Sequence, residues 1–273
     1  MLAKHIINLA NKHASKAKKS LGQNFLVDIA VYEQIRLSLG DLSNKNVLEI
    51  GPGLGSLTHI ILSLLPAKLI AVEKDINFIK LLEENFKHYV ENFTILEADA
   101  LKVNPADLFS TPCYIVANLP YNISTVLLFN WLKNVAHIEN MFLMFQKEVA
   151  ERIVAKPGSK KYGKLSIMVQ LLCEVELLFN ISGNSFNPPP KVMSSFVKIK
   201  PRKTPLVAGV NVVKLEKITN ILFSQRRKML GSTLKKIFDE DQMLIITQKI
   251  DITKRPEELY IEEFCFLANL LEN

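Results

Sequence analysis

Residues 47–58 read VLEIGPGLGSLT, a short apolar run that leads into glycines at positions 51, 53 and 55. An apolar run that ends in closely spaced glycines predicts a strand, a tight turn and then a helix, which begins near Ser56. Glycine in such a turn tolerates positive φ and lets backbone amides come close to a ligand. The stretch therefore predicts a strand–turn–helix unit that binds a ligand at its turn.

Strand-like runs recur along the chain, and helical patterns separate most of them. They lie at residues 46–51, 68–73, 93–98, 113–118, 140–146, 175–181 and 194–200. Alternating strands and helices predict a mostly parallel sheet of the α/β class with helices on both faces. Only the proline-rich NPPPK separates the last two runs, which is too short for a crossover, so these strands should be antiparallel neighbours.

A linker divides the chain at KPRKTP, residues 200–205. Beyond it the apolar residues follow the helical period without strand alternation, which predicts a small helical domain at 206–273. The predicted catalytic domain covers 20–203. Ahead of it, residues 1–19 form a basic arm that superficially matches a transit peptide but contains no arginine, so we expect it to be retained.

The net charge of +7 is unevenly distributed along the chain. Residues 205–273 hold ten basic and ten acidic residues, so the excess lies before them and is concentrated at 12–19, 156–164 and 198–203. Clustered positive charge fits a polyanionic partner such as nucleic acid, and a solvated lysine-rich face explains it equally well.

Composition limits the other classes of protein. No apolar stretch approaches the length of a membrane span, and the three cysteines stand singly in apolar surroundings without metal-ligand spacing. We expect a cytoplasmic protein with reduced thiols, no metal site and no obligate protein partner, and hence a monomer.

Acidic residues end the second and third predicted strands. Glu73 lies 22 residues after Gly51, where its carboxylate can accept hydrogen bonds from both hydroxyls of a ribose, and Asp99 can accept one from an adenine amino group. The GxGxG spacing and the neighbouring Glu49 are unsuited to the pyrophosphate of a nicotinamide cofactor and suit a cationic ligand. S-adenosylmethionine, an adenosine joined to a sulfonium, is the predicted cofactor, and ordinary turn chemistry is the alternative.

The fourth predicted strand ends in Asn118, followed by Leu119, Pro120 and Tyr121. The exocyclic amine of adenine is a poor nucleophile because its lone pair is delocalised into the ring. The Asn118 side-chain carbonyl and the Leu119 backbone carbonyl can accept its hydrogens and aim the lone pair at a methyl group, while Pro120 fixes the turn. Tyr121 can stack on the base. In isolation a β-turn with a structural tyrosine explains NLPY as well.

Eight segments, taken together, resemble one family, the small-subunit ribosomal RNA adenine dimethyltransferases of bacteria and eukaryotes. They are GQNFLVD (22–28), LEIGPGLGSLT (48–58), VEKD (72–75), EADAL (97–101), NLPYNIST (118–125), QKEVAERI (146–153), FNPPPKVMSSFV (186–197) and FSQRRKML (223–230). The resemblance implies a Rossmann-like, seven-stranded S-adenosylmethionine-dependent methyltransferase sheet with a small all-helical C-terminal domain. It also implies N6,N6-dimethylation of two adjacent adenosines near the 3′ end of small-subunit rRNA, with a role in subunit biogenesis.

The resemblance assigns roles to single residues of this chain. It implies that the cofactor is contacted by Asn24, Leu26, Gly51, Gly53, Glu73, Asp99 and Asn118. It also implies that the rings of Tyr121 and Phe186 sandwich the target base. Met193 departs from the polar residue that members often carry. For Arg226, Arg227 and Lys228, contact with RNA and intramolecular pairing are equally good interpretations.

Two other functions stay open. One is the related enzyme that modifies a single adenosine of large-subunit rRNA, and the other is a noncatalytic RNA-binding assembly or transcription factor that retains the fold.

Overall fold

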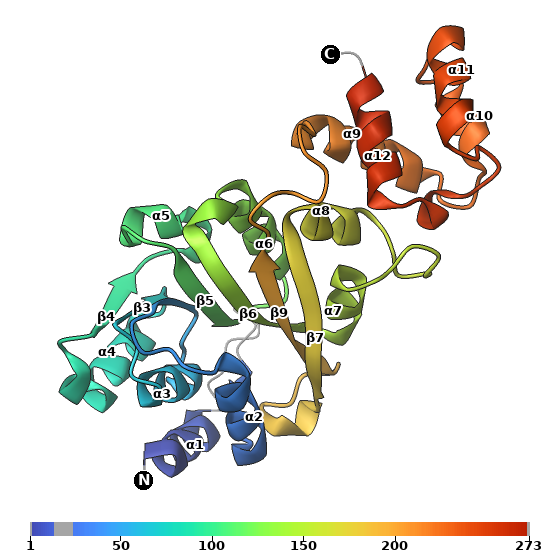
Figure 1. Cartoon of the computed structure of the whole chain (residues 1–273). Helices are drawn as coiled ribbons and strands as arrows, with labels where there is room; N and C mark the ends of the chain where they lie inside the picture. The colour runs from blue at the N-terminus through green and yellow to red at the C-terminus, as the bar shows by residue number, and fades with distance from the viewer. Residues whose placement is uncertain (1, 14–23, 272–273) are drawn as a thin grey trace. The chain divides into compact units, whose positions relative to one another are not determined.

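The computed structural model describes residues 2–13 and 24–271, so residues 14–19 of the predicted basic arm lie outside the described residues (Figure 1). The chain divides into two compact units. The first comprises residues 1–150 and 176–201, and the second comprises residues 151–175 and 202–273. The second unit thus includes residues 151–175, which lie inside the catalytic domain predicted from the sequence. The boundary after residue 150 falls within α7 (Lys147–Ile153).

Seven strands form one sheet in the order β4-β3-β2-β5-β6-β9-β7. They are β2 (Asn46–Ile50), β3 (Lys68–Glu73), β4 (Phe93–Glu97), β5 (Cys113–Asn118), β6 (Ile138–Gln146), β7 (Cys173–Ile181) and β9 (Ser194–Pro201). Strands β2 to β6 pair in parallel, and β9 pairs antiparallel with β6. The predicted α/β fold class is confirmed, and β7 and β9 are neighbours as expected.

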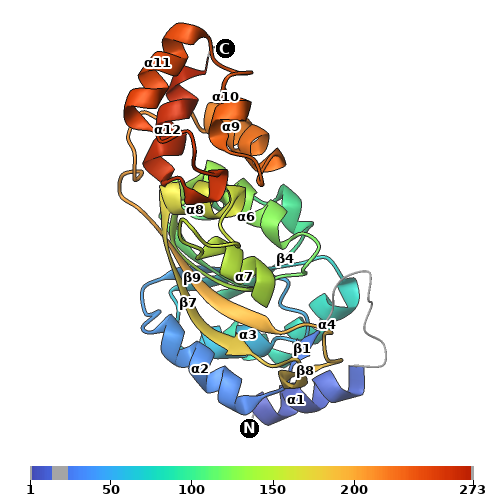
Figure 2. The same ribbon diagram turned by 90° about the vertical axis from the view of Figure 1, so that its right-hand side faces the viewer.

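Burial on both faces explains why the central strands read as continuous apolar runs. Four of the five residues of β2 and four of the six of β3 are buried, and helices lie on both faces of the sheet (Figures 1 and 2). Parallel strands linked by helices are normally covered in this way. The helices of this unit include α2 (Ile29–Leu39), α3 (Ser56–Ser63), α4 (Ile76–Asn85), α5 (Pro105–Leu108) and α6 (Ser124–Lys133).

A second, two-stranded sheet joins segments that are distant in the sequence. Strand β1 (Phe25–Leu26) pairs antiparallel with β8 (Phe186–Asn187), so that Phe25 faces Asn187 and Leu26 faces Phe186. The sequence patterns did not predict this pairing, because two-residue strands leave no periodic signal. It brings Phe25 and Leu26 beside the start of the FNPPP segment.

The second unit is helical beyond residue 211. It contains α8 (Lys164–Leu172), α9 (Val212–Ser224), α10 (Leu230–Leu234), α11 (Glu240–Lys249) and α12 (Ile261–Leu270). Helices α9 and α12 pack together, with the rings of Phe223 and Phe264 stacked 5.7 Å apart. Helix α11 was not predicted, because it lies between the helix-period stretches recognised in the sequence.

Among the described residues, no helix combines the length and the apolar character that crossing a membrane requires. All three cysteines are buried and carry free thiols. Over the same residues, His, Cys, Asp and Glu side chains form no cluster of three that could hold a metal ion.

Candidate active site

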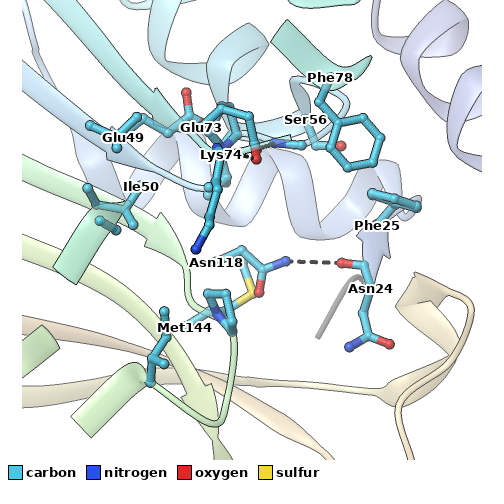
Figure 3. Close-up of a pocket in the computed structure, with 18 of the residues that line it drawn as sticks. Asn24, Phe25, Glu49, Ile50, Ser56, Glu73, Lys74, Phe78, Asn118 and Met144 are labelled. Carbon is cyan, nitrogen blue, oxygen red and sulfur yellow. Dashed lines mark hydrogen bonds between the residues drawn. The ribbon is translucent and has the colours of Figure 1, made fainter. Parts of the chain in front are cut away.

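A cavity of about 330 Å³ lies where β2, β3, β4 and β5 end (Figure 3). Carboxyl ends of parallel strands are the usual ligand site of open α/β sheets. The sequence-predicted residues that line it are Asn24, Leu26, Gly51, Gly53, Glu73, Asp99, Asn118 and Pro120. The structure therefore brings together every residue predicted to bind the cofactor, although that binding itself remains a prediction.

Two glycines of the turn serve different purposes. Gly51 has a φ of +66°, and a Cβ added there would meet nothing within 4 Å, so the backbone borders open space in the cavity. Gly55 has a φ of +90°, and a Cβ there would lie 2.5 Å from Cε2 of Phe86. The first glycine leaves room for a ligand, and the second lets α3 pack closely against α4 and the residues that follow it.

Glu73, at the end of β3, supports the glycine turn. Its Oε2 accepts a hydrogen bond from the backbone N–H of Gly53 at 3.1 Å, and its Oε1 accepts from Lys74 N and Asp75 N at 2.8 and 2.9 Å. The carboxylate thus ties the loop after β2 to the loop after β3. The sequence pattern indicated a ribose-binding role for this residue but gave no sign of this structural role.

Asp99, after β4, is held by its neighbours as an ionised acceptor. Its Oδ1 accepts from the backbone N–H of Leu101 at 3.1 Å, and Lys74 Nζ donates to its Oδ2 at 2.9 Å. The hydrogen bond from Lys74 is the largest cause that lowers the pKa of Asp99. Lys74 also lines the cavity and was missed in the sequence, because a lysine after an acidic residue has no distinctive pattern.

Glu49 is a fully buried carboxyl group at the wall of the cavity. Thr58 Oγ1 donates to its Oε2 at 2.7 Å, whereas its Oε1 has no hydrogen-bond partner among the described residues. Burial raises the pKa of Glu49 to about 8. The group is therefore mostly protonated at neutral pH, and a cationic ligand nearby would favour its ionised form.

We expect Glu49 to make folding stability depend on pH. Its pKa in the folded state, about 8, lies above the ordinary glutamate value of 4.5. Between these values the folded state binds the extra proton, so the free energy of unfolding should fall as pH rises. Glu49→Gln keeps the size and the acceptor for Thr58 but does not titrate. Urea unfolding at pH 5 and pH 8 should show a smaller loss for the variant than for the wild type, and equal losses would contradict this assignment.

Asn118 ends β5, and its amide group is fixed by the opposite wall of the cavity. Its Nδ2 donates to the backbone carbonyl of Asn24 at 3.2 Å (Figure 3). With the NH₂ group engaged in this way, Oδ1 is the atom that can accept a hydrogen bond from a substrate amine.

Tyr121 and Phe186 do not line the cavity in this structure. Tyr121 shares a 2.7 Å hydrogen bond with Ser194 Oγ at the start of β9, and burial raises the pKa of its phenol. Phe186 is 2% exposed and packs in the main hydrophobic core, and the Leu119 side chain is equally buried. The predicted sandwich of a base by these two rings stays a prediction, as does the role of the Leu119 carbonyl.

Two phenylalanine rings complete the wall, and the sequence patterns assigned a role to neither of them. Phe25 and Phe78 both line the cavity, with their rings edge to face at 5.7 Å. Phe25 stands between Asn24 and Leu26 in the QNFL segment, which was the available signal. Phe78 belongs to the apolar face of α4 and resembles an ordinary core residue in the sequence.

The chain is similar to known proteins over nearly its whole length. The family model described as ribosomal RNA adenine dimethylase matches residues 14–273. The chain is 45% identical to the ribosomal RNA small subunit methyltransferase A of Wolbachia pipientis subsp. Culex pipiens (strain wPip), over 94% of this chain and 97% of the relative.

Solved structures show the same fold. A crystal structure of a dimethyladenosine transferase from Plasmodium falciparum aligns with a TM-score of 0.77 and 29% identity, over 89% of this chain and 95% of that chain. The 23S rRNA methyltransferase ErmE aligns with a TM-score of 0.71 and 23% identity, over 91% and 99% respectively. At 23% identity, the similarity to ErmE shows the fold alone. The family match and the relative at 45% identity show the family as well. The chain belongs to the ribosomal RNA adenine dimethylase family.

Proposed function

We propose that this protein transfers methyl groups from S-adenosylmethionine to N6 of two adjacent adenosines near the 3′ end of small-subunit rRNA, during biogenesis of that subunit. The observation that carries the proposal is the cavity, where Gly51, Glu73, Asp99 and Asn118 meet from four strand ends. The relative from Wolbachia carries the name of a small-subunit methyltransferase, and the Plasmodium structure that of a dimethyladenosine transferase.

The residues of the cavity fit S-adenosylmethionine chemically. Glu73 and Asp99 offer carboxylate acceptors for ribose hydroxyls and an adenine amino group. The open space beside Gly51 admits the ligand close to the backbone, and the unpartnered Oε1 of Glu49 offers a carboxyl group for a positive charge. When bound, this cofactor supplies an electrophilic methyl group on its sulfonium.

The protein itself then has to orient the target amine. The Oδ1 of Asn118 and the carbonyl of Leu119 accept hydrogen bonds from the two amine hydrogens, which localises the nitrogen lone pair and directs it to the methyl group. No base is required before attack, because the amine loses a proton readily only after it is alkylated. The absence of a catalytic histidine or thiol among the described lining residues agrees with this mechanism.

A basic loop in the second unit is a candidate site for RNA phosphates. Lys156 and Lys160 are exposed, and neither forms an ion pair among the described residues. Arg226 holds this loop: its Nη2 donates to the carbonyls of Ser159 and Lys160, and its Nε pairs with Glu257 at 3.2 Å. Arg226 is therefore engaged within the protein, whereas Arg227 and Lys228 are exposed.

Removing the two loop charges should weaken RNA binding in a salt-dependent manner. For Lys156→Ala/Lys160→Ala, we expect the slope of log K against log salt to become shallower by about one unit for each phosphate that the loop no longer neutralises. Filter binding of small-subunit RNA at several salt concentrations measures this slope. The matched control replaces Lys217 and Lys235, which are exposed lysines of the same unit outside the loop. Equal effects in both double variants would contradict a specific role for the loop.

Primer extension tests the proposed target. Particles that lack the modification would be treated with the enzyme and cofactor, and the small- and large-subunit RNAs would then be copied across their candidate adenosines. We expect stops at two adjacent adenosines of small-subunit RNA. A stop confined to large-subunit RNA would assign the protein to the related single-adenosine enzymes instead.

A further inference from the structure

The N-terminal helix α1 (Leu2–His13) lies ahead of the region that the family model matches, residues 14–273. No motif of the sequence gave it a role. In the structure it packs beside α3 and β1 (Figures 1 and 2).

The first link between α1 and the cavity is apolar. Ala10 is fully buried in a cluster with Phe25, Leu54 and Phe78. The rings of Phe25 and Phe78 form part of the cavity wall. Because this cluster is closely packed, the position of Ala10 limits the positions that these two rings can take.

The second link is a hydrogen bond. Asn11 Oδ1 accepts from Nδ2 of Asn187 at 2.7 Å, and Asn187 is the partner of Phe25 across β1 and β8. The helix is thus joined to both strands of the small sheet, to one through packing and to the other through a hydrogen bond.

The small sheet in turn positions the amide of Asn118. Asn24 immediately precedes β1, and its backbone carbonyl accepts the 3.2 Å hydrogen bond from Asn118 Nδ2. An amide group has nearly the same shape when flipped by 180°, so this single donor–acceptor pair determines that Oδ1, and not the NH₂ group, is presented to an amine.

We propose that α1 is a positioning element for methyl transfer: Ala10 and Asn11 hold β1 and β8, and the Asn24 carbonyl on that support orients the amide of Asn118. The inference rests on the proposed function, because the amide matters for catalysis only if Asn118 accepts from the target amine. A positioning role predicts loss of turnover in protein that remains folded, since small displacements of reacting groups cost large factors in rate.

Three variants and one control test the proposal by steady-state methyl transfer at saturating cofactor. Ala10→Asp places a carboxylate in the apolar cluster, and we expect kcat to fall about tenfold or more. Asn11→Ala removes the acceptor and should lower kcat about threefold, the size of one modest hydrogen bond. Asn11→Asp keeps an acceptor oxygen and should restore most of the rate. The control, Asn8→Ala, changes an exposed residue of the same helix.

Thermal unfolding of each variant separates a folding defect from a positioning defect. Lower kcat for Asn11→Ala with an unchanged unfolding midpoint, and recovery in Asn11→Asp, supports the proposal. The proposal is overturned if Asn11→Ala keeps the wild-type kcat. It is also overturned if kcat falls by the same factor in all three variants, Asn11→Ala, Asn11→Asp and Asn8→Ala. Asn11 is exposed, so this pair remains informative even if Ala10→Asp does not fold.

A spectroscopic measurement separates this proposal from the proposed function. The side-chain NH₂ signal of Asn118 in a ¹⁵N-correlated NMR spectrum, identified by its loss in Asn118→Ala, reports the hydrogen bond to Asn24 without any turnover. We expect this signal to shift in Asn11→Ala and to stay in place in Asn8→Ala. If the wild type transfers no methyl group, the proposed function fails, and an unmoved signal in Asn11→Ala overturns the positioning role independently.

Discussion

Replacing Asn118 with alanine is expected to lower kcat about 10²–10³-fold, the range found when a preorganised polar group that stabilises a transition state is removed. The variant loses the Oδ1 acceptor that localises the amine lone pair, and it also loses the bond to the Asn24 carbonyl. RNA affinity should change little, because the basic loop that we assign to phosphate binding belongs to the other compact unit. Single-turnover methyl transfer and filter binding measure the two quantities.

Asn122→Ala is the matched control for this experiment. Asn122 is an exposed asparagine in the same loop that also lines the cavity, and it has no hydrogen bond to Asn24 within the described part of the chain. A substantially smaller effect there would separate the function of the Asn118 amide from general disturbance of the loop. Unchanged turnover in Asn118→Ala would refute the role of this amide.

Replacing Glu73 with alanine is expected to raise the Kd of the cofactor about 100-fold or more, since hydrogen bonds to a charged acceptor contribute about 1.5–3 kcal/mol each. Two such bonds to ribose hydroxyls would be lost. The backbone N–H groups of Gly53, Lys74 and Asp75 would also lose their acceptor, so the glycine turn would be less well ordered. Calorimetric titration with S-adenosylhomocysteine measures the affinity without turnover.

The neighbouring strand provides a control for Glu73. Glu97 lies opposite Glu73 in the register of β3 and β4 and is exposed. Glu97→Ala removes the same charge from a residue that does not line the cavity, so its Kd should stay within about twofold of the wild type, as for a surface substitution. An unchanged Kd in Glu73→Ala would show that the ribose is bound elsewhere.

The central strands of the sheet were predictable because they are buried on both faces and therefore read as uninterrupted apolar runs. Lys68–Glu73 and Cys113–Asn118 have the predicted bounds. Glu73 and Asn118, the last residues of these strands, therefore lie at the same edge of the sheet. The cofactor residues could be located for the same reason: parallel strands end at a common edge, so residues far apart in sequence converge there.

Features that depend on tertiary structure could not be predicted in this way. The pairing of Phe25–Leu26 with Phe186–Asn187 joins two short segments without periodicity, and no local pattern encodes the bond between Asn118 and the Asn24 carbonyl. The burial of Phe186 could likewise not be predicted from the sequence, because a phenylalanine beside a proline-rich loop fits a stacking surface and a core position equally well.

The central claim is tested most directly by analysing the nucleosides of small ribosomal subunits that lack the modification, after incubation with the purified protein and S-adenosylmethionine. Mass spectrometry of the digested RNA should show N6,N6-dimethyladenosine, at two residues per particle, with none formed by Asn118→Ala. Absence of dimethyladenosine from these particles, or its formation only in large-subunit RNA, would contradict the proposed function.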